Sequence, residues 1–267
     1  MREVKPSAIR VLVSAARVSM RDFLDVSPPK LYVALVLPRM LFQVLFFYLV
    51  ALLAGGKSLA SYALVGNAFA VSATSVLTGI NNSVRSDRSR GTLEMIVASP
   101  APVLPVVLGE CACPFVEGVF RSSLVLFLMG PLMGITGSQL LRACMAFPIM
   151  IVTIMSLVGL GFLIGSIGLT SSRFNFMPNV ATYTLMFLSG VNYPVEALPQ
   201  WAQAVARVLP MTHGLEGFRA VMQGVGGSAA WYPFIWEVCV AMAYLALGWS
   251  IFERRVSATR QGVSDFV

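Results

Sequence analysis

Charged residues are scarce in this chain of 267 residues and make up only 12% of it. A soluble globular protein carries about 25% charged residues, which cover its surface. Apolar residues make up 57% of the chain, and its mean hydropathy is +0.79. Too little polar sequence is left to cover one large soluble core, so the composition indicates a polytopic membrane protein.

Histidine is almost absent, since His213 is the only one. No pair of imidazoles exists to hold zinc or to form an acid–base relay. Cys111 and Cys113 point to different sides of a helix and make a poor chelate. These two, with Cys144 and Cys239, lie in apolar stretches, where we expect buried free thiols. We therefore predict no catalytic residue, no metal site and no cofactor in this chain.

A complete phosphate-binding loop is missing as well. The only similar stretch, AGGKS at residues 54–58, ends as such a loop does. The loop requires a glycine five positions before Gly56, and this chain has Ala51 there. We therefore predict that any ATP used with this protein is hydrolysed by a separate polypeptide.

No cleavable signal peptide is evident, because the first apolar run begins only near Leu31 and is too long for one. Before it, residues 6–24 have the pattern of an amphipathic helix. Arg10, Arg17 and Arg21 line its polar face, so we expect an interface helix in the membrane plane with arginines toward anionic headgroups. The alternative is a soluble helix packed on a partner. The apolar face holds Ile9, Leu12, Val13, Ala16, Met20 and Phe23.

Six apolar stretches are candidates for crossing the hydrocarbon core, which takes about 20 residues of helix. They predict an all-α transmembrane domain over residues 31–252, between an N-terminal segment 1–30 and a C-terminal tail 253–267. The fifth stretch is short and becomes adequate if the following segment, residues 189–224, enters the outer leaflet. The six stretches are residues 31–54, 59–80, 103–129, 141–169, 174–188 and 231–252.

Lysine and arginine in the short flanks set the orientation, because cytoplasmic flanks carry the excess. With the N-terminus inside, thirteen basic residues lie on the inner side and four on the outer side, so we predict that both termini are cytoplasmic. The same bias explains the net charge of +7 without a nucleic-acid partner. The inner residues are Arg2, Lys5, Arg10, Arg17, Arg21, Lys30, Arg85, Arg88, Arg90, Arg173, Arg254, Arg255 and Arg260, and the outer ones are Lys57, Arg142, Arg207 and Arg219.

Some charged residues fall inside the predicted spans. At the middle of a membrane, each raises the free energy of insertion by about 2.5–3.5 kcal/mol. Glu117 and Arg121 are four residues apart and can pair along one helix face, which Glu110 shares. Two interpretations stay open: this face lines the route of a polar substrate group, or its charges form an internal lock. Arg39 and Glu237 lie in the first and sixth spans.

Two segments between the spans have a helical pattern of their own. In residues 81–103, a cluster of Arg, Asp and Ser precedes a short helix of mixed character that suits a partner's surface. The segment 189–224 is too polar to span, and its prolines bracket one short helix, while Thr212 can cap a second that Gly224 ends. The first of these helices places Trp201, Val205, Val208 and Leu209 on one face.

These segments carry the motifs of a known family. GTLE at residues 91–94, followed by Ser99-Pro100, resembles the coupling helix of type-2 permeases of ATP-binding-cassette (ABC) exporters. The segment 189–224, with SG, an ALP-W run and a later LP, resembles their extracellular re-entrant hairpin. Gly109-Glu110 resembles a motif that is often found in the drug and lipo-oligosaccharide exporter branch of this family. The resemblance covers nearly the whole chain in the right order.

The resemblance implies a membrane permease that works with two copies of an ABC ATPase, on which ATP and Mg are bound. A second copy of the permease, or a homologous one, would complete the pathway in the cytoplasmic membrane. A coupling helix at about residues 84–99 would dock on the ATPase, and the re-entrant hairpin would gate the exit. The coupling residues implied are Gly91, Thr92, Leu93, Glu94, Ser99 and Pro100, and the gate residues are Ser189, Gly190, Pro194, Leu198, Pro199, Trp201 and Pro210.

Export of an amphipathic substrate is the function that the resemblance implies, with a drug or antibiotic, a lipid or a lipo-oligosaccharide as the candidates. An ion-coupled secondary transporter is one alternative, and it would show inverted repeats or broken helices at corresponding positions. An intramembrane enzyme is another, and it would need a catalytic constellation within the spans. We find neither pattern in the sequence.

Overall fold

The computed structural model describes residues 8–90, 103–168 and 176–264, and within these ranges its regular elements are all helical. This confirms the all-α class. Short turns of π-helix at Tyr32–Val36 and Val125–Met129, and a 3-10 turn at Val195–Ala197, connect the α-helices. The α-helices are α1 Ala8–Val26, α2 Pro29–Leu31, α3 Leu37–Arg90, α5 Val103–Leu124, α6 Gly130–Leu132, α7 Gly137–Met145, α8 Phe147–Gly168, α9 Met177–Leu188, α10 Gln200–Ala206, α11 Thr212–Gln223 and α12 Ser228–Ser264.

Helix α3 is a hairpin of two long arms. Its backbone leaves the helical region at Gly55 (φ −145°, ψ 16°) and at Gly56 (φ 70°, ψ −164°). Only glycine adopts the second conformation readily. The stretch AGGKS is therefore the turn between the arms. The arms match the first two predicted spans.

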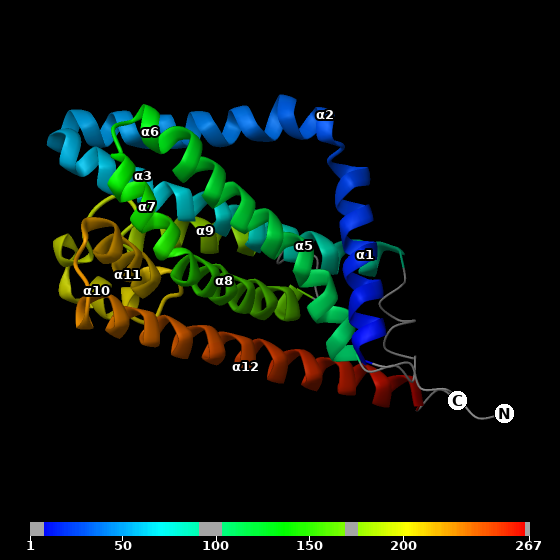
Figure 1. The fold of residues 1–267 in the computed structure, drawn as a ribbon. Helices are drawn as coiled ribbons and strands as arrows, with labels where there is room; N and C mark the ends of the chain where they lie inside the picture. The colour runs from blue at the N-terminus through cyan, green and yellow to red at the C-terminus, as the bar shows by residue number, and fades with distance from the viewer. Residues whose placement is uncertain (1–7, 91–102, 169–175, 265–267) are drawn as a thin grey trace.

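The long helices run side by side, whereas α1 lies across one end of them (Figure 1). We refer to this end as the α1 end, and to the opposite end, where α7, α10 and α11 lie, as the α11 end. The first described residue, Ala8 of α1, and the last, Ser264 of α12, both lie at the α1 end (Figure 1). Helix α1 therefore has the crosswise placement expected of an interface helix.

Four helical segments are long and apolar enough to cross a membrane, within the ranges that the structure describes. The first is the hairpin of residues 29–83, and the others are Leu104–Leu132, Phe147–Ile167 and Ser228–Arg254. The predicted fifth span corresponds to α9, which has only 12 residues. The predicted span 141–169 is interrupted at Ala146 (φ −80°, ψ 0°), so its first part is the separate helix α7.

Close backbone contacts bring the long helices together. A Cβ added at Gly159 of α8 would lie 3.0 Å from the amide nitrogen of Leu245 in α12, and one at Gly248 of α12 would lie 3.0 Å from the amide nitrogen of Leu163. Glycine at both positions thus allows α8 and α12 to pack backbone to backbone. Helix α12 continues to Ser264, so most of the predicted tail is helical.

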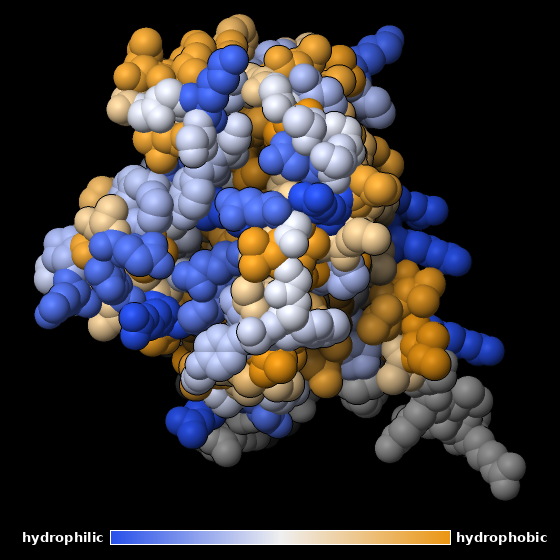
Figure 2. Space-filling model, turned by 60° about the vertical axis from the view of Figure 1, so that its left-hand side comes forward, coloured by the Kyte–Doolittle hydropathy of each residue, from blue (hydrophilic) through white to orange (hydrophobic). Residues whose placement is uncertain are grey.

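The second arm of α3 lies at the centre of the bundle. From Ala63 to Ala73 every residue is buried, including the polar Asn67 and Ser72. The α11 end is different, because hydrophilic side chains gather across it between apolar areas (Figure 2). This distribution is what the surface of a membrane protein shows where it leaves the hydrocarbon region.

Candidate functional site

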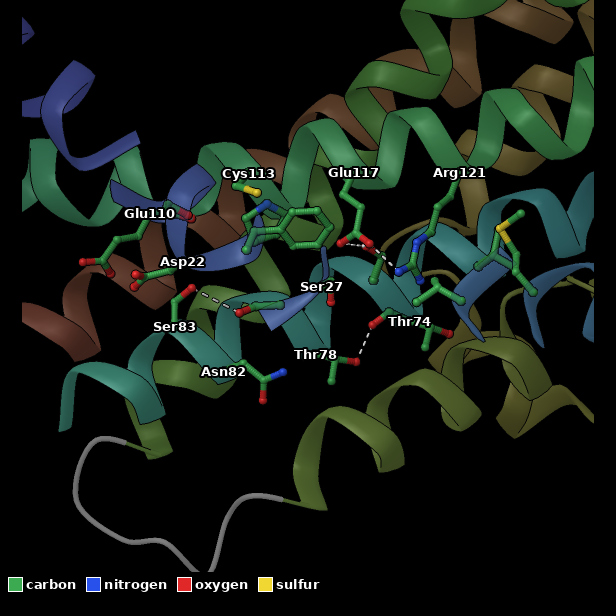
Figure 3. Close-up of a pocket in the computed structure, with 18 of the residues that line it drawn as sticks. Asp22, Ser27, Thr74, Thr78, Asn82, Ser83, Glu110, Cys113, Glu117 and Arg121 are labelled. Atoms are coloured by element: carbon green, nitrogen blue, oxygen red, sulfur yellow. Dashed lines mark hydrogen bonds and ion pairs between the residues drawn. The ribbon is translucent and has the colours of Figure 1, made fainter. Parts of the chain in front are cut away.

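A cavity of about 420 Å³ opens between α1, both arms of α3 and α5 at the α1 half of the molecule. This volume falls within the range of sites for small molecules. Polar and apolar side chains share its walls (Figure 3). The charged residues on its walls are Asp22, Arg39, Glu110, Glu117 and Arg121.

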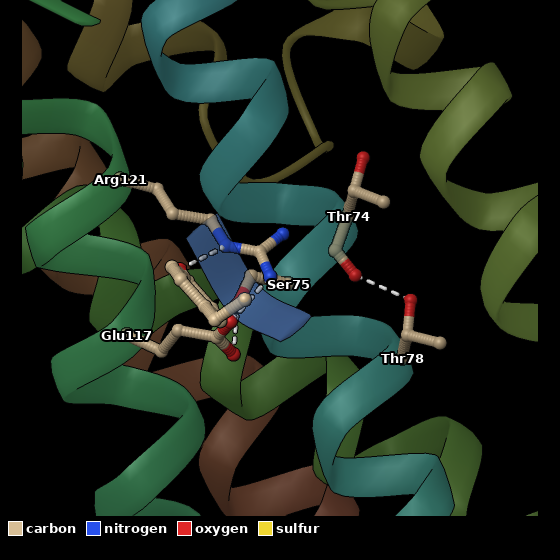
Figure 4. Close-up of polar contacts among 6 residues, drawn as sticks. Thr74, Ser75, Thr78, Glu117 and Arg121 are labelled. Carbon is tan, nitrogen blue, oxygen red and sulfur yellow. Dashed lines mark hydrogen bonds and ion pairs between the residues drawn. The ribbon is translucent and has the colours of Figure 1, made fainter. Parts of the chain in front are cut away.

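Glu117 and Arg121 of α5 form the ion pair that their spacing predicts. The Ser75 hydroxyl donates to Glu117 Oε2 at 2.6 Å, and Arg121 Nε donates to the Tyr32 hydroxyl at 3.1 Å (Figure 4). The guanidinium also lies over the Tyr32 ring, 5.6 Å from its centre. One charge pair thus joins three segments: the turn before α3, the second arm of α3, and α5. Both interpretations of the pair remain compatible with this geometry, because the pair also lines the cavity.

Glu110 and Asp22 lie together at the other end of the cavity (Figure 3). The Ser19 hydroxyl of α1 donates to the backbone oxygen of Glu110 at 3.0 Å. Next to it, a Cβ at Gly109 would lie 2.6 Å from Ala15 Cβ. The Gly109-Glu110 pair is therefore a place of close contact between α1 and α5.

The start of α11 is held by Glu237 of α12, whose side chain is completely buried. Glu237 Oε1 accepts from the amide of Met211 at 2.9 Å and from the Ser156 hydroxyl, and Oε2 accepts from the amide of Gly214 at 2.9 Å. Met211 takes the left-handed φ of 79°. The prediction that Thr212 caps this helix was wrong, because a carboxylate from another helix already satisfies its first amides.

Arg219 of α11 is buried and bonded only to backbone oxygens among the contacts described for it. Its terminal nitrogens donate to Gly190 at 2.8 Å, Tyr62 at 3.0 Å and Val191 at 3.1 Å. Its guanidinium carbon lies 3.4 Å from the centre of the Tyr62 ring. Burial lowers the pKa of Arg219 to about 10, so it is charged at neutral pH. The sequence predicts Arg219 as a basic residue of an outer flank, whereas in the structure its side chain is buried inside the bundle.

The other end of α11 meets a cation. Arg142 of α7 donates to the backbone oxygen of Met222 at 3.4 Å, and Gly224 ends the helix with φ 80°, as predicted. A carboxylate at the first turn and a guanidinium at the last turn both match the helix dipole. Helix α11 is therefore fixed at its two ends and, through Arg219, along its length.

The residues predicted to gate the exit lie in two environments. Ser189 is buried and donates to Pro210 at 3.5 Å, and Asn192 accepts from the buried amide of Asn67 at 2.8 Å. On α10 the apolar face is exposed, with Trp201 at 68% and Val205 at 44%, and Val208, which follows the end of the helix at Ala206, is exposed too. Gly190 has φ 71°, Pro194 precedes the 3-10 turn, Leu198 is buried and Pro199 precedes α10.

His213 is partly buried within this segment. Its Nε2 is 2.9 Å from the backbone oxygen of Arg207, and its Nδ1 is 3.4 Å from Glu216 Oε2. The hydrogen bond to Glu216 raises the pKa of His213. This environment is that of a hydrogen-bonded hairpin residue.

The remaining predicted residues are those of the interface helix, the coupling segment and the four cysteines. Arg10, Arg17 and Arg21 are all exposed on α1. The coupling residues at positions 91–94, 99 and 100 lie outside the described residues. The prediction of buried thiols holds for Cys111 and Cys113 and was wrong for Cys144 and Cys239, which are exposed, because an apolar helix face in a membrane protein also faces lipid.

A family profile and several known proteins match this chain. The profile of a family described as ABC-2 type transporter matches residues 18–223. The probable multidrug ABC transporter permease YbhR of Escherichia coli K12 is 25% identical over 178 residues, 65% of this chain and 47% of that protein. Nodulation protein J of Rhizobium meliloti is 26% identical over 138 residues, 51% of each protein.

A shorter similarity is to the capsule polysaccharide export inner-membrane protein CtrC of Neisseria meningitidis, which is 34% identical over 98 residues, 36% of each protein. The chain thus spans about half the length of YbhR and nodulation protein J. The match to the family profile includes the C-terminal half of α1, the α3 hairpin, the cavity and the segment up to the end of α11.

Proposed function

Because the chain belongs to the ABC-2 type transporter family, whose profile matches residues 18–223, we propose that it is the membrane subunit of an ATP-driven exporter. The family match is the observation that carries this proposal. It agrees with the all-helical fold and with four segments long enough to cross a membrane. We further propose that both termini are cytoplasmic, as the distribution of basic residues indicates.

ATP would be hydrolysed on a separate ABC ATPase, in two copies, with two permeases side by side as a homodimer or a heterodimer. We propose that the coupling residues Gly91 to Glu94 and Ser99-Pro100 contact this ATPase. They follow directly on α3, which ends at Arg90 at the α1 end (Figure 1). Movement of the ATPase would then reach the second arm of α3 and, through the Gly109 contact, α1.

The segment 189–224 would act at the exit. We propose that it re-enters the outer leaflet, with α11 as its fixed part. Glu237, Arg219 and Arg142 all hold α11, whereas Trp201 of α10 and Val208 just after this helix present an apolar face to the exterior. An opening of the exit would therefore involve α10 and leave α11 in place.

The names of the similar proteins refer to multidrug transport, nodulation and capsule polysaccharide export. We propose an amphipathic substrate, such as a drug or antibiotic, a lipid or a lipo-oligosaccharide, which leaves across the cytoplasmic membrane. For Glu117 and Arg121 we favour the role of a lock, because their partners Ser75 and Tyr32 come from two other segments. Glu117→Gln should then lower stability and transport together, and transport lost with unchanged stability would favour the pathway role.

Co-expression with an ATPase encoded next to this protein tests the proposal. Purification through a tag on this chain should recover the ATPase in a fixed ratio. Its turnover should fall when Glu94 is changed to Lys and should be unaffected by Glu196→Lys, a control at an exposed acid of the α11 end. If no ATPase is recovered, an ion-coupled secondary transporter becomes the better proposal, and proton-gradient assays would examine it.

A further inference from the structure

We propose that His213 forms a pH-dependent latch, which holds the end of α10 against α11 when its imidazole is protonated and loosens when the imidazole is neutral. The latch consists of His213, the backbone oxygen of Arg207 and the carboxylate of Glu216. It lies at the α11 end, where α10, α11 and the start of α12 meet (Figure 1). The latch rests on the proposed export function only for the role of α10 at the exit.

Both ring nitrogens of His213 face oxygen atoms that accept hydrogen bonds. Nε2 lies 2.9 Å from the backbone oxygen of Arg207, the residue directly after α10, and Nδ1 lies 3.4 Å from Glu216 Oε2. A carbonyl oxygen and an ionised carboxylate can only accept. A neutral imidazole has one N–H donor, whereas the protonated ring has two. The protonated ring is therefore the form that makes both contacts as hydrogen bonds.

The charged groups around the ring favour the same form. On α11 the hydrogen bond to Glu216 has the largest effect and raises the pKa of His213, which outweighs the opposite effect of burial. From α12, Glu237 also attracts the protonated ring, and the ring of Trp236 packs 6.1 Å away between ring centres. From the end of α10, Arg207 contributes its backbone oxygen, while its own side chain is exposed.

The latch joins a fixed helix to one that is held less firmly. His213 lies in the first turn of α11, which Glu237 fixes through two backbone amides. Helix α10 packs on a small apolar cluster through Ala202 and Ala206, whereas its opposite face is exposed. A change in the latch should therefore move α10 and leave α11 in place.

Loss of the proton weakens the hold on α10. One nitrogen of the neutral ring carries no hydrogen, so either Arg207 or Glu216 then meets a lone pair instead of a donor. The bond that remains is no longer assisted by a charge and is weaker. Tyr244 of α12 also donates to the backbone oxygen of Val208 at 3.4 Å. Because a tyrosine titrates only near about pH 10, that contact stays constant while His213 titrates.

The direction with pH follows from the raised pKa of His213. The latch is fully formed below about pH 6.5 and weakens as the pH rises through the raised pKa. The α11 end is the predicted outer side, so the pH outside the membrane would set the state of the latch. Under the proposed function, acid outside would hold α10 in place and slow export.

His213 is the only histidine of the chain, so ¹⁵N-histidine labelling gives NMR signals from this ring alone. The measurement uses full-length protein in lipid bilayers, purified through a tag without histidine. We expect both ring nitrogens to carry a proton at about pH 5.5 and the titration midpoint to lie above about 6.5. Glu216→Gln should lower this midpoint, whereas Glu196→Gln, at an exposed acid of the same segment, should leave it unchanged.

Hydrogen exchange, corrected for the intrinsic pH dependence of amide exchange, measures the opening of α10. Peptides from residues 200–209 should open about tenfold more often at about pH 8.5 than at about pH 5.5 in the wild type. His213→Asn cannot titrate and should show no such difference. Peptides from residues 214–224 of α11 are the internal control, and their corrected exchange should be equal at both pH values.

A titration midpoint at or below about 6.5, or the same pH dependence of residues 200–209 in the wild type and in His213→Asn, would overturn the latch. If His213→Asn does not fold, Glu216→Gln decides, because the pH at which exchange of residues 200–209 changes must shift with the midpoint of His213. These measurements need no ATPase. Failure to recover an ATPase would therefore reject the export function and keep the latch, whereas pH-independent exchange would reject the latch and keep the export function.

Discussion

Glu237 offers the sharpest test of how the segment after α9 is held. Its carboxylate is the acceptor for two amides at the start of α11, those of Met211 and Gly214, and for the hydroxyl of Ser156. Glu237→Ala removes both acceptor oxygens, and with them three hydrogen bonds, and leaves buried donors unpaired. We expect the first turns of α11 to open far more often, while the rest of the bundle stays folded.

The magnitude follows from the two amide bonds. A hydrogen bond to a charged group contributes about 1.5–3 kcal/mol. Loss of both bonds should lower the local opening free energy by about 3–6 kcal/mol, which is about a hundredfold to ten-thousandfold in the opening equilibrium. Glu237→Gln keeps one acceptor oxygen and should increase the opening equilibrium constant only about ten- to a hundredfold.

Hydrogen exchange measured by mass spectrometry reports this opening directly. Peptides from residues 211–224 should exchange faster in Glu237→Ala than in Glu237→Gln, and faster in Glu237→Gln than in the wild type. Glu253→Ala, at an exposed acid near the other end of α12, is the matched control and should exchange like the wild type. Unchanged exchange of residues 211–224 in Glu237→Ala would refute the anchoring role.

Three further predictions concern the same region. Gly66→Ala should prevent normal folding, because its Cβ would lie 1.9 Å from a backbone oxygen, whereas Gly137→Ala has open space and should fold, as size-exclusion profiles would show. Arg219→Lys cannot keep all three carbonyl bonds together with the ring contact and should lower stability by about 2–4 kcal/mol in denaturant titrations. The pKa of His213 is raised by Glu216, so their contact stabilises the fold below about pH 6.5 and is lost as pH rises above the raised pKa. His213→Asn should therefore lower the melting temperature more at about pH 5.5 than at about pH 8.5, and an equal effect at both would contradict this.

The sequence was sufficient for features that depend on spacing along one helix. The Glu117 and Arg121 pair, the amphipathic α1 and the end of α11 at Gly224 all follow from local patterns, and the structure has each of them. The four-residue spacing placed two opposite charges on one face, and an apolar environment leaves such charges little alternative to pairing.

Contacts between distant segments could not be predicted in the same way. Glu237 stood out as an acid in an apolar span, but nothing near it in the chain indicates that its partners are Met211 and Gly214. Thr212 looked like a helix cap because caps are usually local. Arg219 looked like a flanking charge because its three carbonyl partners come from Tyr62 and from residues 190–191.

The two-glycine turn of α3 also has a consequence for biosynthesis. From residue 40 to residue 84 the chain carries a single charged side chain, Lys57, which lies next to the turn. Both arms can therefore enter the bilayer together as one folded pair, and only one ammonium group has to cross the hydrocarbon core. The short turn leaves no soluble loop to be translocated with it. Insertion of this hairpin thus needs little help beyond the apolarity of its two arms.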